Sequence, residues 1–289
     1  MSSETQWSNI PPEVGDREWT DFLLGERPIA GLKAPLLPPP EVQSQFVGSS
    51  GRDALWEAST FCSKLVSASG RFGEGIGRDV RLLDFGVGWG RLYRIFLNRV
   101  LPKNLIGVDI DEGCIQFCKE AMPYGVFVKN EASVPLQFET NYFDIVYAYS
   151  VFSHLAENAF TAWVKEFRRV LRPGGLLIFT TLKDAHLEVW RHQSTGADPW
   201  FASYLKNADF DHKEWQQKLE QGDFLYVPTG GGSLRDSSFY GEAIVTRKYL
   251  EKVSHNLGYA VRVFEDGGEL PQSFVVMQVA ATELGANVG

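Results

Sequence analysis

Residues 82–92 read LLDFGVGWGRL, an apolar run that ends in an acid and then places glycines at alternate positions. Leu82–Phe85 has the character of a short buried strand, and Gly86, Gly88 and Gly90 follow it directly. Glycine loses the most backbone entropy on folding and adds no side chain to a core, so packing alone does not favour this cluster. The close approach of a ligand to the backbone does favour it. The stretch therefore predicts a binding loop at the end of a strand.

Strand and helix patterns alternate around this loop. Expected strands cover residues 80–85, 104–110, 125–129, 143–149 and 176–181, and expected helices cover 91–101, 112–121 and 157–171. Strands separated by helices of this length predict right-handed crossovers and a parallel sheet. Two later strands, 259–266 and 273–280, have too short a connection for a crossover helix, so the last should run antiparallel. The predicted class is α/β, a Rossmann-like, seven-stranded, mostly parallel sheet with helices on both faces.

Three parts are expected along the chain. An N-terminal arm and first helix should occupy residues 1–74, and the core should combine 75–183 with 241–289. The alternation breaks at 184–240, which we interpret as a substrate-covering insertion between the fifth and sixth strands of the sheet. The aromatic residues of this insertion have two open interpretations, an acceptor pocket or a small core of their own.

The composition is that of a soluble globular protein with an acidic balance. The 289 residues are 44% hydrophobic and 22% charged, with a net charge of −8, which does not favour broad binding to nucleic acid or anionic membranes. The first residues lack the features of a secretion signal, and no apolar run approaches the roughly 18 residues that span a bilayer. Cys62, Cys114 and Cys118 lack metal-ligand spacing and are expected to be buried. We expect a cytoplasmic protein with no nucleic-acid or membrane partner.

An acid at the end of the second expected strand narrows the class of ligand. Asp109 follows the glycine loop by about 20 residues, where a carboxylate can accept hydrogen bonds from both hydroxyls of a ribose. This arrangement suits either NAD or S-adenosylmethionine. The Gly-x-Gly-x-Gly spacing differs from the Gly-x-Gly-x-x-Gly form expected for dinucleotides, and the terminal strand pair also disfavours NAD.

Taken in order, these segments resemble the class I S-adenosylmethionine-dependent methyltransferases. LLDFGVGWGRL is similar to that family's first motif. The other similar segments are the ribose-binding motif GVDID (107–111), the adenine-contact loop NEASVPLQF (130–138), the fourth-strand motif FDIVYAYSVFSHL (143–155) and the helix and turn WVKEFRRVLRPGG (163–175). The resemblance implies S-adenosylmethionine as the cofactor.

The resemblance also implies which residues contact that cofactor. The three glycines of the loop would face its methionine part, Asp109 its ribose and Asn130–Glu131 its adenine. The full predicted set is Asp84, Gly86, Gly88, Gly90, Arg91, Asp109, Ile110, Asn130, Glu131, Tyr149 and Ser150. Asn130 stands where many family members have Asp, so an amide would replace a carboxylate at the adenine.

A histidine is the candidate catalytic residue. Methyl transfer to a hydroxyl is helped by a general base, and histidine is the commonest side chain in that role. His154 follows the fourth expected strand and is predicted to be this base, or alternatively to orient the loop or cap the next helix. His186, His192 and Asp184 are second candidates. They do not form a ligand set, so no metal is expected.

The sequence thus predicts an S-adenosylmethionine-dependent methyltransferase that acts on a small-molecule or sugar-containing acceptor, at oxygen. One alternative is a non-catalytic protein that binds the same cofactor with the same fold. A second alternative is an NAD-dependent oxidoreductase. The partner is expected to be a small-molecule or glycan acceptor, and the sequence does not fix the oligomeric state.

Overall fold

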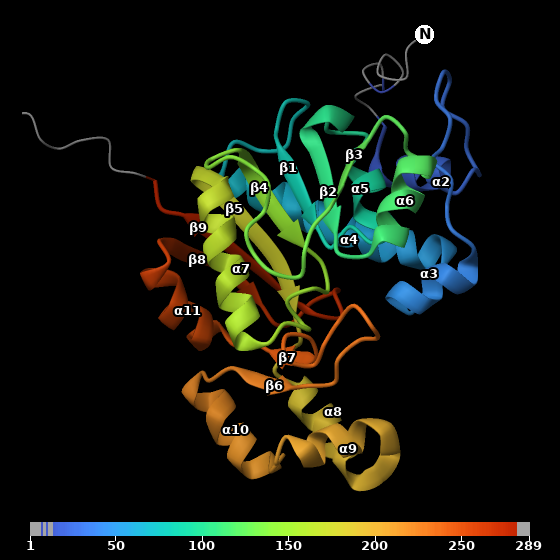
Figure 1. Ribbon diagram of the computed structural model, residues 1–289. Coiled ribbons are helices and arrows are strands. Elements are labelled where there is room, and N and C mark those ends of the chain that lie inside the picture. The colour runs from blue at the N-terminus through green and yellow to red at the C-terminus, as the bar shows by residue number, and fades with distance from the viewer. Residues whose placement is uncertain (1–6, 8–9, 11–13, 282–289) are drawn as a thin grey trace, which may run out of the picture. The chain divides into compact units, whose positions relative to one another are not determined.

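Figure 1 shows the fold of the protein, a computed structural model that describes residues 7, 10 and 14–281. Seven strands form one sheet in the order β3-β2-β1-β4-β5-β9-β8. Their bounds are Leu82–Phe85 (β1), Leu105–Asp109 (β2), Val126–Lys129 (β3), Phe143–Ala148 (β4), Leu171–Thr181 (β5), Tyr259–Glu265 (β8) and Ser273–Val279 (β9). β1 pairs in parallel with β2 and β4, and β9 pairs antiparallel with both β5 and β8. The predicted Rossmann-like class is confirmed.

The chain divides into two compact units. Met1–Glu131 and Ile145–Tyr147 form the first unit, and Ala132–Asp144 and Ala148–Gly289 form the second. The three-part division expected from the sequence remains a prediction.

The first unit holds β1, β2, β3 and most of the N-terminal helices. Its helices are α2 (Asp16–Leu23), α3 (Pro40–Val47), α4 (Gly51–Phe72), α5 (Arg91–Phe96), the 3-10 helix η1 (Pro102–Asn104) and α6 (Glu112–Ala121). The arm expected to lack regular structure thus contains α2 and α3. α4 continues to Phe72, and Ala68 and Ser69 extend its buried face near that end. α5 ends at Phe96 instead of residue 101, where the amide N–H groups of Arg99 and Val100 both bond to the Phe96 carbonyl.

An arginine on α5 connects the arm to the glycine loop. The Arg94 side chain is fully buried, and it donates to the carbonyl oxygens of Gly90 (2.9 Å), Trp89 (2.9 Å) and Leu36 (3.1 Å). Its guanidinium carbon also lies 5.0 Å from the centre of the Trp89 ring. Burial lowers the pKa of Arg94 to about 10. No ion pair of Arg94 is found among the described residues, so backbone carbonyls stabilise this buried charge.

The arm also packs on α5 through aromatic rings. Trp19 of α2 is buried and donates its indole N–H to the carbonyl of Arg94 at 2.9 Å. Its ring lies 5.0 Å from that of Phe22 and 6.2 Å from that of Trp7. The arm is therefore part of the core of the first unit.

The second unit holds the remaining strands and helices, except that Ile145–Tyr147 of β4 belong to the first unit. They include α7 (Glu157–Val170), α8 (His186–His192), the π-helical stretch η2 (Gln193–Ala197), α9 (Pro199–Asn207), α10 (His212–Gln221) and α11 (Arg247–Asn256). A separate two-stranded sheet pairs β6 (Leu225–Val227) with β7 (Glu242–Ile244), and the sequence analysis did not anticipate it. Thr246 caps α11 as predicted, because its side chain accepts from the Tyr249 N–H.

The insertion expected at 184–240 contributes most of a hydrophobic core. Trp190, Phe201 and Trp215 are buried in one cluster with apolar residues of β6 and β7, and Tyr204 and Phe210 pack against it. Trp200 is an exception, with 60% of its surface exposed. Of the two interpretations of these aromatics, the core is therefore the one that the packing favours.

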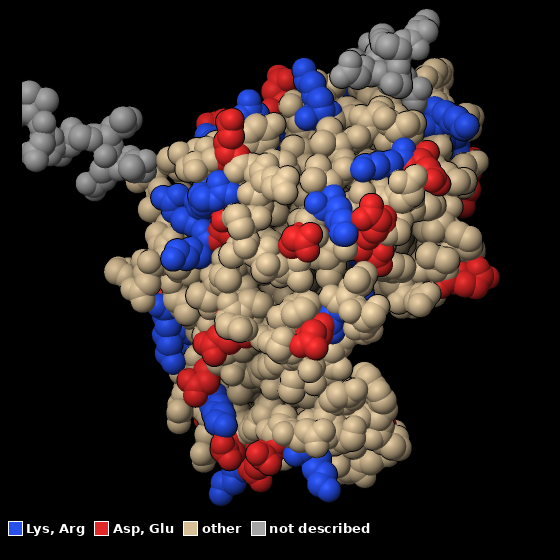
Figure 2. All heavy atoms as spheres, in the orientation of Figure 1, with Lys and Arg blue, Asp and Glu red and all other residues tan. Residues whose placement is uncertain are grey.

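Charges of both signs are interspersed on the surface. Figure 2 shows acidic side chains beside basic ones over the face in view. Several form local ion pairs, such as Lys218–Glu214 on α10 and Arg247–Glu251 on α11. Among the described helices, none is long and apolar enough to cross a membrane.

Replacing the buried arginine should destabilise the protein far more than replacing an exposed one. Arg94→Met removes the guanidinium donor from the carbonyls of Trp89 and Leu36, whereas the Gly90 carbonyl keeps the N–H of residue 94 at 3.2 Å. Each buried unsatisfied group costs about 1–3 kcal/mol, so we expect a loss of about 2 kcal/mol or more. Arg247→Met removes only an exposed pair and should cost less than about 1 kcal/mol. Urea unfolding of both variants measures the difference. Equal losses would show that the buried contacts of Arg94 contribute no more than a surface ion pair.

Candidate functional site

The glycine loop takes a left-handed backbone between β1 and α5. Gly86, Gly88 and Gly90 have φ angles of 81°, 51° and 79°, which side chains with a Cβ rarely adopt. The amide N–H groups of Gly86 and Val87 both donate to the carbonyl of Val108 on β2, each at 2.9 Å. The loop is thereby fixed against the neighbouring strand.

A carboxylate at the end of β2 completes this attachment. Asp109 is buried, and its Oδ2 accepts a hydrogen bond from the Gly88 N–H at 2.8 Å. Its Oδ1 accepts from the Asp111 N–H at 2.9 Å. A carboxylate of this kind, fixed by two backbone donors at the end of a strand, is a group that hydroxyl donors can bind.

The glycines of the loop serve different purposes. A Cβ on Gly88 would meet no atom within 4 Å, so the backbone there lies open. A Cβ on Gly90 would lie 2.7 Å from Cε of Met122 and 3.2 Å from Sγ of Cys118. Gly107 on β2 similarly makes room for Val87, whose Cγ2 would lie 2.8 Å from an added Cβ. Of the two loop glycines Gly88 and Gly90, only Gly88 leaves open space for a ligand, whereas Gly90 permits close packing on α6.

A second carboxyl group lies at the end of β1. Asp84 is buried, and burial raises its pKa to about 8, with a smaller opposing effect from the nearby Tyr147 hydroxyl and a reinforcing one from the charge of Asp109. Its Oδ2 has no hydrogen-bond partner among the described residues. At neutral pH this carboxyl group therefore holds a proton in the ligand-free protein.

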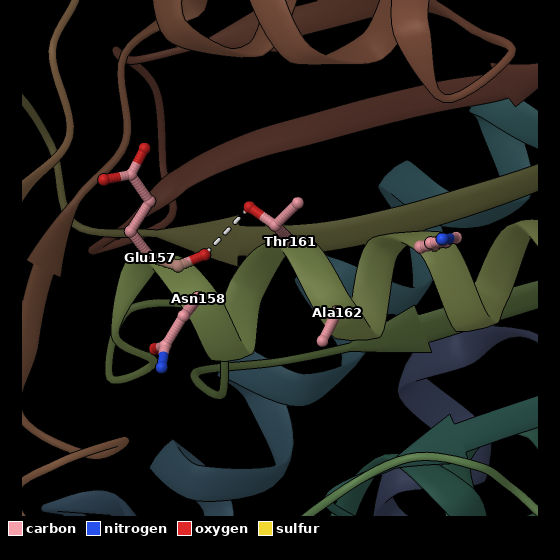
Figure 3. Close-up of a pocket in the computed structure, with 5 residues that line it drawn as sticks. Glu157, Asn158, Thr161 and Ala162 are labelled. Carbon is pink, nitrogen blue, oxygen red and sulfur yellow. Dashed lines mark hydrogen bonds between the residues drawn. The ribbon is translucent and has the colours of Figure 1, made fainter.

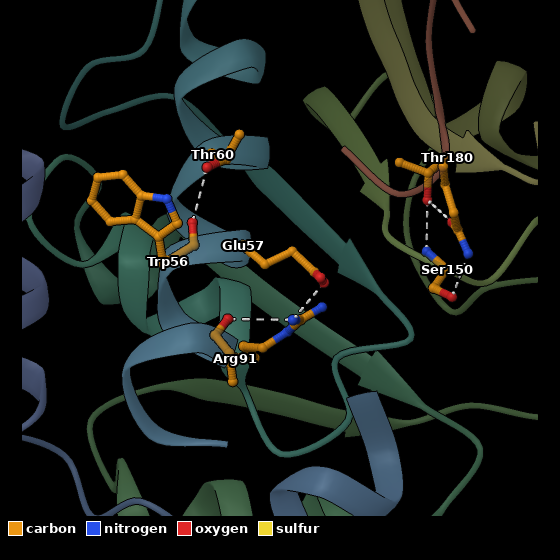
Figure 4. A network of polar contacts seen from close by, with 8 residues as sticks. Trp56, Glu57, Thr60, Arg91, Ser150 and Thr180 are labelled. Atoms are coloured by element: carbon orange, nitrogen blue, oxygen red, sulfur yellow. Dashed lines mark hydrogen bonds and ion pairs between the residues drawn. The ribbon is translucent and has the colours of Figure 1, made fainter. Parts of the chain in front are cut away.

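Arg91 is held by α4. Its guanidinium donates to Glu57 at 2.9 Å and to the Ala54 carbonyl at 3.3 Å, as Figure 4 shows. Only 4% of the residue is exposed. In the same view Thr60 donates to the carbonyl of Trp56, whose ring is exposed. Arg91 thus fixes α4 to the start of α5 and has its side chain already engaged.

The residues predicted to contact adenine lie beside Asp109. Ile110 follows Asp109 directly and is half-buried, and the Asn130 N–H donates to the Asp109 carbonyl at 3.0 Å. The Asn130 amide donates to the Glu131 carbonyl at 2.8 Å, while its Oδ1 is buried without a partner among the described residues. The side chain of Glu131 is exposed. The first unit therefore brings together nine of the predicted cofactor residues, those from Asp84 to Glu131.

The remaining two predicted residues, Tyr149 and Ser150, lie in the second unit. Ser150 has a φ of 56°, and its N–H donates to Oγ1 of Thr180 at 2.8 Å (Figure 4). The Gln272 amide donates to Oγ of Ser150 at 2.9 Å, and Thr180 donates to Oε1 of Gln272 at 2.6 Å. This network holds the turn after β4 in a conformation that is rare for serine. Tyr149, immediately before it, is half-buried.

His154 lies in the second unit against the chain that enters β7. Its Nδ1 is 2.8 Å from the Gly241 carbonyl and 3.5 Å from Oε1 of Glu242. Its ring stacks on Tyr240 with centroids 5.0 Å apart and planes inclined by 13°. Because a carbonyl oxygen can only accept, Nδ1 carries the hydrogen and Nε2 keeps its lone pair. Burial lowers the pKa of His154, so the imidazole is neutral and can act as a base near neutral pH.

The sequence analysis missed Gly241 and Glu242 as partners of His154. Gly241 is 87 positions away along the chain, and no local pattern connects the two segments. Burial raises the pKa of Glu242 to about 7. A glutamate in an otherwise apolar strand segment, EAIV, was the one available signal.

The second candidates form no comparable arrangement. Burial and the charge of Asp266 raise the pKa of Asp184 to about 6, and burial lowers the pKa of His186. His192 is exposed. Among the described residues no group of three or more histidine, cysteine or acidic side chains could hold a metal. The three cysteines are buried, as expected, and none forms a disulfide within the described part of the chain.

A hollow elsewhere on the second unit has no catalytic arrangement. It is lined only by residues of α7, which are Glu157, Asn158, Thr161, Ala162 and Lys165. Figure 3 shows Thr161 donating to the carbonyl of Glu157 within the helix. The hollow therefore lies along the surface of a single helix.

A glycine loop at the end of β1 and an acid at the end of β2 define the class of Rossmann-like nucleoside-binding proteins. A family model described as a methyltransferase domain matches residues 83–179. The malonyl-[acyl-carrier protein] O-methyltransferase of Methylococcus capsulatus is 31% identical over 159 residues, which cover 54% of this chain and 55% of the relative. The phthiotriol/phenolphthiotriol dimycocerosates methyltransferase 1 of Mycobacterium ulcerans is 32% identical over 125 residues, or 42% and 44% of the two chains.

A solved structure shares the fold. It is the magnesium protoporphyrin IX methyltransferase of Synechocystis PCC 6803 with bound SAH, at 13% identity and a TM-score of 0.50, covering 82% of this chain and 93% of that one. The chain spans about half the length of the two curated relatives. These matches place a methyltransferase domain at residues 83–179, and together with the ordered motifs they bear out the resemblance to the class I S-adenosylmethionine-dependent methyltransferases.

The buried acid of β1 should give stability a particular pH dependence. Asp84 binds its proton up to about pH 8 in the folded state but only to about pH 4 when unfolded, so its contribution to stability is lost as pH rises through this window. Asp84→Asn removes the titratable carboxyl group at this position. The free energy of unfolding of the variant should therefore rise relative to that of the unchanged protein from pH 5 to 8, by up to about 1.4 kcal/mol per pH unit.

Urea unfolding at pH 5, 6, 7 and 8 measures this difference, and the other titrating groups cancel because both proteins contain them. The exposed Asp79 provides the matched control, since Asp79→Asn should leave the pH dependence unchanged. A difference between Asp84→Asn and the unchanged protein that stays constant over this range would show that Asp84 is already ionised in the folded protein.

Proposed function

We propose that this chain transfers a methyl group from S-adenosylmethionine to an oxygen atom of a small-molecule or sugar-containing acceptor. The cofactor supplies the methyl group on a sulfonium, which is already reactive toward nucleophiles. The protein therefore has to hold the donor, orient the acceptor and accept the acceptor's proton.

The observation that carries the proposal is the hydrogen bond between the Gly88 N–H and Asp109. It fixes a loop whose backbone is open at Gly88 beside a buried carboxylate at the end of β2. Ribose hydroxyls are donors of the kind that this carboxylate can bind. A preformed site of this type loses little free energy to ordering when the ligand binds.

Two further acceptors in the first unit fit the same ligand. Oδ1 of Asn130 and Oδ2 of Asp84 are buried without partners in the described part of the chain. An adenosyl amino acid carries an exocyclic amine and an ammonium group that could donate to such atoms. Buried acceptors that lack a donor are costly, and a bound donor would remove that cost.

The full proposed cofactor set keeps the residues expected from the sequence. In the first unit it comprises Asp84, Gly86, Gly88, Gly90, Arg91, Asp109, Ile110, Asn130 and Glu131, and in the second Tyr149 and Ser150. For Arg91 we propose an indirect part, because its side chain is engaged with Glu57 and Ala54.

His154 is the proposed catalytic base. Its Nε2 has a lone pair, and no described residue occupies it with a hydrogen bond. A neutral imidazole in this state suits removal of a proton from a hydroxyl group. The name of the Methylococcus relative, an O-methyltransferase, supports oxygen as the atom that receives the methyl group.

Calorimetry with S-adenosylhomocysteine tests the cofactor part of the proposal. The unchanged chain should bind this ligand and should not bind NAD. Asp109→Ala should weaken binding at least tenfold, or about 1.4 kcal/mol, because paired hydrogen bonds to the ribose hydroxyls are lost. Asp79→Ala is the control, since Asp79 is exposed and should leave the dissociation constant unchanged. An unaltered constant in Asp109→Ala would remove this residue from the site.

A pair of glycine variants separates backbone strain from ligand contact. Gly88 and Gly25 both have positive φ, 51° and 75°, and an added Cβ on either meets no protein atom within 4 Å. Both Gly88→Ala and Gly25→Ala should lose about 1–2 kcal/mol of stability. Only Gly88→Ala should lose affinity for S-adenosylhomocysteine, because its methyl group enters the space proposed for the donor. Equal affinities in calorimetry would place the donor elsewhere.

The alternatives give different results in the same experiments. Binding of NAD in place of S-adenosylhomocysteine would indicate an oxidoreductase. Binding of S-adenosylhomocysteine without methyl transfer to a panel of sugars and small phenols would favour a non-catalytic cofactor-binding protein.

A further inference from the structure

We infer that Glu242 is a positioning residue that orients His154 and stabilises the imidazolium formed when Nε2 takes a proton from an acceptor hydroxyl. The inference rests on the proposed function, since it gives that reaction a partner for its base. Glu242 would act through His154 and would not contact the acceptor.

The geometry of the pair is set by backbone hydrogen bonds. The Gly241 N–H donates to the carbonyl of His154 at 2.7 Å, and the Ala243 N–H donates to that of Ser153 at 2.8 Å. These bonds place Glu242, which lies between the two donors, directly beside the His154 ring. The 3.5 Å distance from Nδ1 to Oε1 follows from this register.

The Nδ1 side of the ring is thus oriented by two acceptors. Nδ1–H donates chiefly to the Gly241 carbonyl at 2.8 Å, with the carboxyl group of Glu242 as a longer second contact. Tyr240 covers one face of the ring. The ring is therefore held with Nε2 directed away from the strand that positions it, in the tautomer that a base requires.

Glu242 is the acidic side chain beside His154, and its negative charge can favour a cationic imidazole. Arg235 and His186 both lower the pKa of His154. The guanidinium carbon of Arg235 lies 5.6 Å from the centre of the Tyr240 ring, and the His154 imidazole stacks on that same ring. Within the described chain Glu242 pairs with no lysine or arginine, so its carboxylate is available to the imidazolium.

The proton and electrons balance as follows. The acceptor O–H proton moves to Nε2, and the electron pair of that bond stays on oxygen and forms the new bond to the methyl carbon. The carbon–sulfur bond breaks with its electron pair on sulfur, which becomes a neutral thioether. The imidazolium then carries the positive charge 3.5 Å from Glu242 until it releases the proton to water.

Two neighbouring groups of this kind titrate as a pair. Burial raises the pKa of Glu242 to about 7 and lowers that of His154, because burial disfavours the charged form of each group. An ion pair between them keeps the imidazole protonated to higher pH than burial alone would allow. Removing the carboxylate should therefore lower the pH at which His154 loses its proton.

The test is an NMR titration of the full chain labelled with ¹³C and ¹⁵N histidine, in which His154 is identified among five histidines by its loss in His154→Gln. The ¹⁵N shifts should show hydrogen on Nδ1. In Glu242→Gln the His154 midpoint should fall by at least half a pH unit, or about threefold in proton affinity. Glu220→Gln, an exposed carboxylate on α10, should leave it unchanged.

A reciprocal measurement guards against a folding defect in Glu242→Gln. In His154→Gln the ¹³C carboxyl midpoint of Glu242 should rise, because a positive neighbour is lost. A His154 midpoint that does not move in Glu242→Gln overturns the inference, and so does a Glu242 midpoint that does not rise in His154→Gln.

Neither titration needs donor or acceptor, so the result is independent of the proposed function. Where methyl transfer is found, Glu242→Gln should lower turnover and shift its acid limb to lower pH while the affinity for S-adenosylhomocysteine is kept. A merely structural residue would lower turnover without moving that limb.

Discussion

The hydrogen bond from the Gly88 N–H to Asp109 is the contact on which the first unit depends, because it joins the loop after β1 to the end of β2. On one side of the loop, β2 accepts from the N–H groups of Gly86 and Val87. On the other side, buried Arg94 donates to the carbonyls of Trp89 and Gly90. The N–H groups of the loop are thus bonded to β2 and its carbonyls to Arg94. The open backbone at Gly88 therefore has its conformation without a bound ligand.

Two carboxyl groups near this loop have different protonation states for a physical reason. Asp109 accepts two backbone hydrogen bonds, which favour its charged form, whereas Oδ2 of Asp84 is buried without a donor and burial raises the Asp84 pKa to about 8. A cationic group of the proposed ligand placed beside Asp84 would favour the carboxylate, so binding of such a ligand would release the Asp84 proton. The cost of burying a second negative charge would then be offset by the cation that accompanies it.

The sequence predicted the strands of the sheet and the loop because both depend on local patterns, namely apolar runs of strand length and glycines followed by an acid at Asp109. It did not predict the burial of Arg94, because an arginine in a helix resembles a surface residue until the arm that covers it is seen. The helices α2 and α3 were missed because each has only eight residues, which is shorter than the stretch of about 11–18 residues over which helical periodicity can be recognised. The pairing of His154 with Glu242 joins segments that only the fold brings together.

That pairing assigns a structural purpose to the insertion of the second unit. Glu242 belongs to β7, whose partner β6 packs with Trp190 and Trp215 in the core of the insertion. The turn that carries His154 is bound to the same β7 segment through Gly241 and Ala243. The surroundings of His154, the proposed base, are thus set by the folding of this part of the second unit, while the glycine loop and Asp109 belong to the first unit. Changes around β6 and β7 are therefore expected to alter the surroundings of His154 without altering the hydrogen bonds that hold the glycine loop.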